Sequence, residues 1–164
     1  MDTAHSSAGR QAAVESPDGN RTFMVVVYAA QFFFGGWFFY NGLNFFVEFF
    51  PQPPGSSALA YQLISALIDT GLFAVVKILE GIVGLMLLSN RFVPLAIMLA
   101  FPISVSIAHL NLVNVQDPLG IGTGVVILAL NGIMALGYLD KFLPMLTYNS
   151  GDPSPLGLRK LLGK

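Results

Sequence analysis

Apolar residues occur along this chain in four long runs that short polar breaks separate. No Lys, Arg, Asp or Glu lies between Thr22 and Val47, within 92–116 or within 118–139. A helix rises about 1.5 Å per residue and needs about 20 apolar residues to cross roughly 30 Å of hydrocarbon. The pattern therefore predicts an all-α fold, a four-helix transmembrane bundle, with spans over residues 23–46, 70–89, 92–113 and 121–140.

The second span differs from the others because it carries two charged residues, Lys77 and Glu80. We assign it as a span because the residues on both sides of this pair are almost purely apolar. Ahead of it, the proline-rich segment 51–55 must break any helix. Residues 58–68 then place apolar side chains at helical spacing, but about 12 residues are too few to span. A short interfacial helix is therefore predicted between the first and second spans.

The composition agrees with this reading of the pattern. Charged residues make up only 10% of the 164 residues, whereas a soluble domain usually carries about 25%. Eight Lys and Arg residues, nine Asp and Glu residues and no long basic run exclude an electrostatic nucleic-acid binder. The absence of cysteine excludes disulfides, Cys-ligated zinc, iron–sulfur clusters and thiol catalysis. We therefore predict an integral membrane protein.

The positive charges lie on one side of the predicted bundle. Arg10 and Arg21 precede the first span, Arg91 lies in the second connection, and the remaining basic residues outside the spans follow the fourth. The first and third connections contain neither Lys nor Arg. Since positively charged flanks stay on the cytoplasmic side, both termini are predicted to be cytoplasmic. The polar composition predicts a disordered tail over 1–21, and residues 143–164 form the second cytoplasmic tail.

The most specific sequence motif begins at Lys77. Residues 77–94, Lys-Ile-Leu-Glu-Gly-Ile-Val-Gly-Leu-Met-Leu-Leu-Ser-Asn-Arg-Phe-Val-Pro, resemble the DoxX family of small bacterial membrane proteins. In that family a glutamate begins a Gly/Leu-rich half-helix before such a connection. Residues 42–46 resemble the family's motif at the end of the first span, although Phe45 stands where a lysine is common. The resemblance covers residues 32–142 and implies a single-domain, four-helix, multi-pass protein of the bacterial inner membrane.

The ionisable residues within the spans are the first candidates for a site. Lys77 and Glu80 are three residues apart and therefore share one helix face. Each charge costs about 2.5–3.5 kcal/mol at the bilayer centre, so the two are expected to pair inside the bundle. The pair is either structural, an ion pair that fixes helix packing, or functional, a proton relay or ligand anchor. The sequence leaves both interpretations open.

Further polar side chains fall at a similar predicted depth. Counted along the spans, His109 lies about five residues below the outer boundary and Lys77 about seven, by the helical rise. A bundle interior is where such groups satisfy one another. The candidates for ligand binding or proton relay are therefore Asn41, Asn44, Lys77, Glu80, His109 and Asn131.

The histidine count and the spacing of polar residues limit the cofactors that the chain could bind. A bis-histidine haem within one chain is excluded, because the second histidine, His5, lies in the polar tail. The spacing of polar residues predicts no metal site. Some DoxX relatives are named as subunits of quinone-linked oxidoreductases, so the resemblance implies a redox-associated subunit that binds a quinone or another apolar small molecule.

The expected partners of such a subunit are membrane lipid and either a partner oxidoreductase subunit or a second copy of the chain. Two other functions stay open. The first is a membrane scaffold that recruits soluble enzymes, in which the polar cluster is structural. The second is a small transporter with Lys77 and Glu80 as its proton-coupled site.

Overall fold

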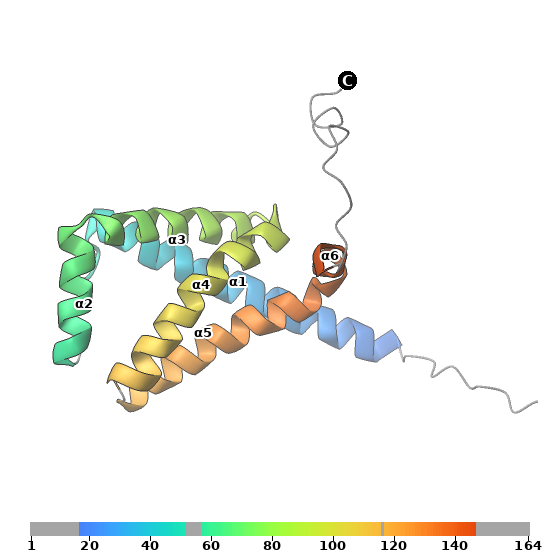
Figure 1. Ribbon diagram of the computed structural model, residues 1–164. Helices are drawn as coiled ribbons and strands as arrows, with labels where there is room; N and C mark the ends of the chain where they lie inside the picture. Colours follow the sequence, from blue (N-terminus) through green and yellow to red (C-terminus); the bar gives the residue numbers. More distant parts are fainter. Residues whose placement is uncertain (1–16, 52–56, 116, 147–164) are drawn as a thin grey trace, which may run out of the picture.

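The computed structural model describes residues 17–51, 57–115 and 117–146. Within these ranges every regular element is a helix, and four long helices pack into a bundle (Figure 1). This confirms the predicted all-α bundle. The elements in chain order are α1 (Pro17–Val47), α2 (Ala58–Asp69), α3 (Leu72–Leu88), α4 (Val93–His109), the π-helical segment η1 (Leu110–Val115), α5 (Pro118–Gly137), α6 (Leu139–Phe142) and the 3-10 helix η2 (Leu143–Leu146).

The helices have the length and composition of membrane spans. Among the described residues, Gly19–Val47, Val93–Val115 and Pro118–Gly137 are long and apolar enough to cross a membrane. The pair formed by α2 and α3 meets the same test as one broken span. These helices are compatible with the multi-pass membrane protein that the sequence predicts.

Helices α1 and α3 form the most extensive helix pair, and glycines let their backbones approach closely. A Cβ atom at Gly84 would lie 2.7 Å from the carbonyl oxygen of Gly35 and closer still to the backbone nitrogen of Phe39. A Cβ atom at Gly42 would lie 2.6 Å from the backbone nitrogen of Gly81. Since Gly35 lies by Gly84 and Gly42 by Gly81, the two helices run antiparallel.

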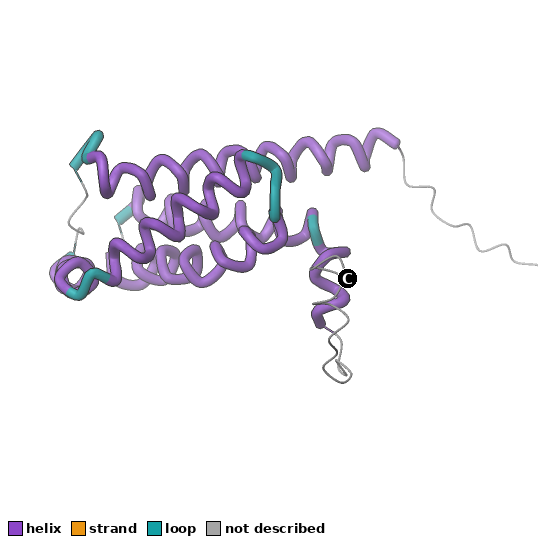
Figure 2. The backbone as a smooth tube through the Cα atoms, turned by 90° about the horizontal axis from the view of Figure 1, so that it is seen from above, coloured by secondary structure: helices purple, strands orange, loops and turns teal. Residues whose placement is uncertain are grey.

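Helices α4 and α5 form the other half of the bundle and lie side by side (Figures 1 and 2). A Cβ atom at Gly124 would lie 3.2 Å from the Cα atom of Ala108, near the shared end of this antiparallel pair. Helix α5 also packs on α1, where Gly137 meets Val27. The N-terminal part of α1 extends beyond the other helices in both views.

The α2–α3 connection turns the chain sharply. The two helix axes meet at 88°, and Figure 1 shows α2 lying across the end of α3. Gly71 makes this turn possible with φ +74°, a left-handed conformation that favours glycine. The side chain of Ser57 caps α2 by accepting a hydrogen bond from the Ala60 backbone nitrogen at 3.1 Å. The short helix predicted between the first two spans is thus present, at right angles to α3 and at its N-terminal end.

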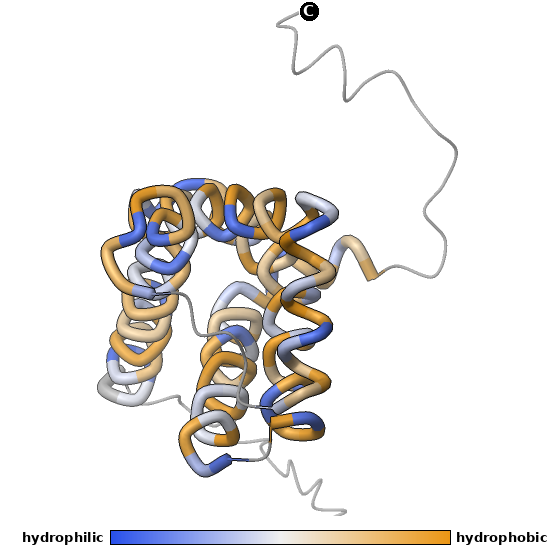
Figure 3. The backbone as a smooth tube through the Cα atoms, turned by 90° about the vertical axis from the view of Figure 1, so that its left-hand side faces the viewer, coloured by the Kyte–Doolittle hydropathy of each residue, from blue (hydrophilic) through white to orange (hydrophobic). Residues whose placement is uncertain are grey.

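The core lies where all four long helices meet. Phe34 and Phe38 of α1 are almost fully buried, and their rings stack with centroids 4.2 Å apart. They pack with Val83 and Leu87 of α3 and with apolar residues of α4 and α5. Large apolar side chains also cover the outside of the helices, and much of the bundle is coloured as hydrophobic in Figure 3. An apolar exterior is the surface that a lipid environment requires.

Several helix ends differ from the predicted ones. Helix α1 begins at Pro17, so residues 17–21 are helical rather than part of a disordered tail. Helix α5 begins at Pro118, because the Asp117 side chain accepts a hydrogen bond from the Gly120 backbone nitrogen at 2.8 Å and proline suits the first turn. It ends at Gly137 rather than at 140. The predicted tails over 1–16 and 147–164 lie outside the described residues.

Candidate functional site

The charged pair of α3 lies inside the bundle. Lys77 Nζ donates a hydrogen bond to Glu80 Oε2 at 2.8 Å, and both residues are buried. The three-residue spacing places the two side chains on one face of α3, where they line a cavity together with residues of α1, α4 and α5. Lys77 Nζ also lies 5.1 Å from the centre of the Phe73 ring, where a cation–π interaction offsets part of its desolvation.

A cavity of about 160 Å³ lies beside this pair. Its polar wall comes from Asn41 of α1 and from Lys77 and Glu80 of α3. Asn41 Nδ2 donates to the Trp37 carbonyl oxygen at 2.8 Å, which leaves the amide oxygen of Asn41 as an acceptor. The remaining lining residues are Trp37, Phe38, Ile107, Thr123 and Ile127.

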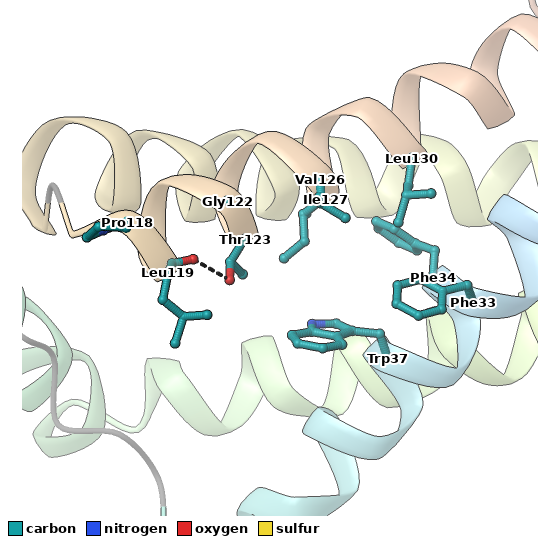
Figure 4. Close-up of a pocket in the computed structure, with 10 residues that line it drawn as sticks. All are labelled: Phe33, Phe34, Trp37, Pro118, Leu119, Gly122, Thr123, Val126, Ile127 and Leu130. Atoms are coloured by element: carbon teal, nitrogen blue, oxygen red, sulfur yellow. Dashed lines mark hydrogen bonds between the residues drawn. The ribbon is translucent and has the colours of Figure 1, made fainter.

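A larger apolar cavity of about 280 Å³ lies between α1 and α5 (Figure 4). Aromatic and aliphatic side chains line most of it, and the Thr123 hydroxyl donates to the Leu119 carbonyl oxygen at 2.9 Å. Trp37, Thr123 and Ile127 line both cavities. The apolar cavity and the charged pocket beside Lys77 and Glu80 therefore share one wall.

We compared the chain with protein-family models, curated proteins and solved structures. No protein-family model, no curated protein and no solved structure matches it. The likeness to DoxX proteins therefore rests on the sequence motifs at residues 42–46 and 77–94.

The structure brings together only part of the predicted cluster. Asn41, Lys77 and Glu80 meet at the charged pocket. Asn44 is buried but serves the chain: its Nδ2 donates to the Phe50 carbonyl oxygen at 3.0 Å, and its Oδ1 accepts from the Phe50 backbone nitrogen at 2.9 Å. Asn44 thus closes the turn after α1 and is no part of the pocket.

His109 and Asn131 do not join the pocket either. His109 is exposed at the end of α4 and lines neither cavity, so the expected convergence with Lys77 does not occur. Ile107, two residues earlier, does line the pocket, and two residues rotate a helix by about 200°. Asn131 is buried one turn beyond Ile127, and neither of its amide atoms has a hydrogen-bond partner among the described residues.

A second polar group, which the sequence did not predict, lies at the opposite end of α3. Gln31 Nε2 donates to the Leu87 carbonyl oxygen at 2.9 Å and to Asn90 Oδ1 at 3.0 Å. The Tyr138 hydroxyl donates to Gln31 Oε1 at 2.8 Å. The only sequence signal was a glutamine inside an apolar run.

The Gln31 group and the Lys77–Glu80 pair differ in the hydrogen-bonding atoms that they leave unused. Gln31 uses both its amide nitrogen and its amide oxygen on protein partners. At the charged pocket, Lys77 has further N–H groups and Glu80 has a second oxygen, with no other hydrogen bond among the described residues. Within those ranges, no three His, Asp or Glu residues lie close enough to hold a metal ion. The pocket is suited to an organic ligand with a polar end.

Proposed function

We propose that this chain is a DoxX-like membrane protein that binds a quinone or another apolar small molecule beside Lys77 and Glu80. It acts as a redox-associated subunit in the bacterial inner membrane, with both termini in the cytoplasm. The observation that carries the proposal is the wall that the apolar cavity and the charged pocket share, formed by Trp37, Thr123 and Ile127. A ligand with an apolar body and a polar end fits this combination.

The physical case rests on matching each half of the ligand to one cavity. Quinones join a flat polar ring to a long apolar tail. The apolar cavity between α1 and α5 offers aromatic and aliphatic walls to the tail, and its burial there is favourable. Lys77 offers N–H donors to a ring carbonyl in a setting of low dielectric, where such a hydrogen bond is stronger than in water.

Binding can be followed through Trp37, the one tryptophan of the chain, which lines both cavities. Purified protein in lipid nanodiscs is titrated with a decyl-substituted benzoquinone. We expect saturable quenching of Trp37 fluorescence in the wild type and in Leu136→Ala, a control on the exposed face of α5. The folded double variant Lys77→Met/Glu80→Gln should show little quenching.

Extraction of the protein from its native membrane completes the test. Bound quinone in the lipid extract supports the proposal. If soluble enzymes co-purify and the decyl quinone does not bind, the scaffold function replaces it. Quenching that is equal in the wild type and in the double variant would show that the charged pair does not hold the ligand.

Orientation is tested separately by cysteine labelling, since the chain contains no cysteine. Single cysteines at Asn20, Ser56, Gln116 and Ser150 are treated with an impermeant thiol reagent on intact cells; the last three positions lie outside the described residues. Only positions 56 and 116 should react. Labelling at position 20 or 150 would reverse the proposed topology.

A further inference from the structure

The hydrogen-bonding groups of the charged pocket restrict which polar end a ligand can have. Lys77 Nζ uses one of its three N–H groups on Glu80 Oε2, at 2.8 Å. Glu80 Oε1 has no hydrogen-bond partner among the described residues. It is also not fully enclosed by them. The pocket therefore offers donors from Lys77 and an acceptor from Glu80.

Asn41 of α1 adds a second acceptor to the same pocket. One N–H of its Nδ2 donates to the Trp37 carbonyl oxygen at 2.8 Å, which leaves the amide oxygen and the second N–H for a ligand. The polar side chains of the pocket thus offer acceptors from Glu80 and Asn41, and donors from Lys77, Asn41 and the indole N–H of Trp37. A ligand that only accepts hydrogen bonds would satisfy Lys77 but would leave the Glu80 oxygen without a donor.

An unsatisfied carboxylate oxygen is costly once a ligand shields it from water. Burying a polar group without its hydrogen bond removes much of the gain from binding, and the cost is greater for a charged group. A hydroxyl group avoids this cost because it accepts from one neighbour and donates to another. A carbonyl or ether oxygen in the same position can only accept.

We propose that the pocket selects a ligand whose polar end is a phenolic hydroxyl, so that the hydroquinone binds in preference to the quinone. The hydroxyl oxygen accepts from Lys77 Nζ, and its proton is donated to Glu80 Oε1. The inference rests on the proposed function, because it assigns the chemical class of the ligand in the same pocket. It concerns binding alone and requires no electron transfer within this chain.

The test compares three ligands that share one decyl tail: a hydroquinone, its quinone and its dimethyl ether. The ether keeps the ring and both oxygens but has no hydroxyl proton. Affinities are measured anaerobically in nanodiscs through Trp37 fluorescence, directly for the quinone and by competition for the others. A hydrogen bond to a charged group predicts that the hydroquinone binds at least about tenfold tighter than either of the others.

Glu80→Gln sharpens the same experiment. Glutamine replaces the free carboxylate oxygen with an amide that can donate, so the preference for hydroquinone should fall to about twofold or less by the same hydrogen-bond energies. If this variant does not fold, the comparison of the three ligands on the wild type still decides.

The possible outcomes separate this inference from the proposed function. Tighter hydroquinone binding supports both. Equal affinities for hydroquinone, quinone and ether overturn the hydroxyl preference but leave a quinone site in place. Preference for the quinone also overturns it. If none of the three ligands binds, both the inference and the proposed function fail.

Discussion

The two buried polar groups of this bundle face different surroundings at the two ends of α3. Gln31 connects α1 to the Leu87 carbonyl, to Asn90 and to Tyr138, and both ends of its amide are used on the protein. Among the described residues, Lys77 and Glu80 form hydrogen bonds only with each other through their side chains, and both line a cavity. Both groups are buried and both lie at the contact of α1 and α3.

This difference separates a structural role from a binding role. A buried polar group whose donors and acceptors are all used on the protein fixes the arrangement of helices and has nothing left for a ligand. A group with unused donors and acceptors beside a cavity can bind one. Burial alone therefore does not identify a site in a membrane bundle, whereas unused hydrogen-bonding groups that line a cavity do.

The largest expected effect comes from a change that damages both groups. In Gly84→Leu the new side chain meets the backbone of Phe39 and Gly35, so α1 must move away from α3. The cost should exceed the about 1–3 kcal/mol typical of overpacking, because backbone rather than side chain is displaced. Thermal unfolding in detergent should show no folded bundle.

Leu85→Ala is the matched control for this variant. Leu85 is 58% exposed, so its truncation should change the melting temperature little. A Leu85→Ala protein less stable than Gly84→Leu would mean that the close contact of α1 and α3 contributes less to stability than the exposed face of α3.

The second effect concerns the charged pair alone. Lys77→Met or Glu80→Gln leaves the partner charge buried and unpaired, which should cost about 3–5 kcal/mol in stability. The double variant removes both charges and should recover most of that loss. Chemical denaturation of the three variants measures this directly.

The double variant also distinguishes the two roles of the pair. We expect it to be folded but unable to bind the decyl quinone. A double variant that binds like the wild type would place the pair with Gln31, as a structural element.

A smaller loss is expected at the other end of α3. Gln31→Leu removes the partner of the Tyr138 hydroxyl and of the Leu87 carbonyl, which should cost about 1–3 kcal/mol. The Trp37 titration should keep its wild-type affinity, because Gln31 lines neither cavity. Loss of quinone affinity at unchanged stability would reverse the assignment of roles.

The smallest effect should have the opposite sign. Asn131 has two buried amide atoms without partners among the described residues, so Asn131→Leu should stabilise the bundle by about 1 kcal/mol. Asn131→Ala, which leaves space behind, is the control. A clear loss of stability in Asn131→Leu would show that the amide has a partner in the membrane.

The sequence predicted the fold well because its spans depend on one quantity, the length of each apolar run. The predicted spans over 70–89 and 92–113 agree closely with α3 and with α4 continued by η1. The errors lie at helix ends, where local capping decides. At Asp117 and Pro118 both capping signals were present in the sequence, whereas the helical start at Pro17 lies within a polar segment.

The site was only partly predictable, because depth along a span does not give the direction in which a side chain points. His109 and Ile107 have nearly the same depth, yet Ile107 lines the pocket and His109 is exposed. The i,i+3 spacing of Lys77 and Glu80 does fix a shared face, so this pair was found. Gln31 was missed because its partners Leu87, Asn90 and Tyr138 are more than fifty residues away in the chain.

The right angle between α2 and α3 has a consequence for how the pocket sits in a bilayer. The α2 axis makes an angle of 88° with the α3 axis. In a membrane that α3 crosses, α2 therefore lies along the membrane surface, at the headgroup level. Only Thr70 and Gly71 join it to α3, and Lys77 follows six residues after Gly71, about 9 Å deeper by the helical rise. In such a membrane the pocket lies at a fixed depth below the face on which α2 lies. In a thicker or thinner bilayer it keeps its distance from that face, while the mismatch is taken up at the opposite side.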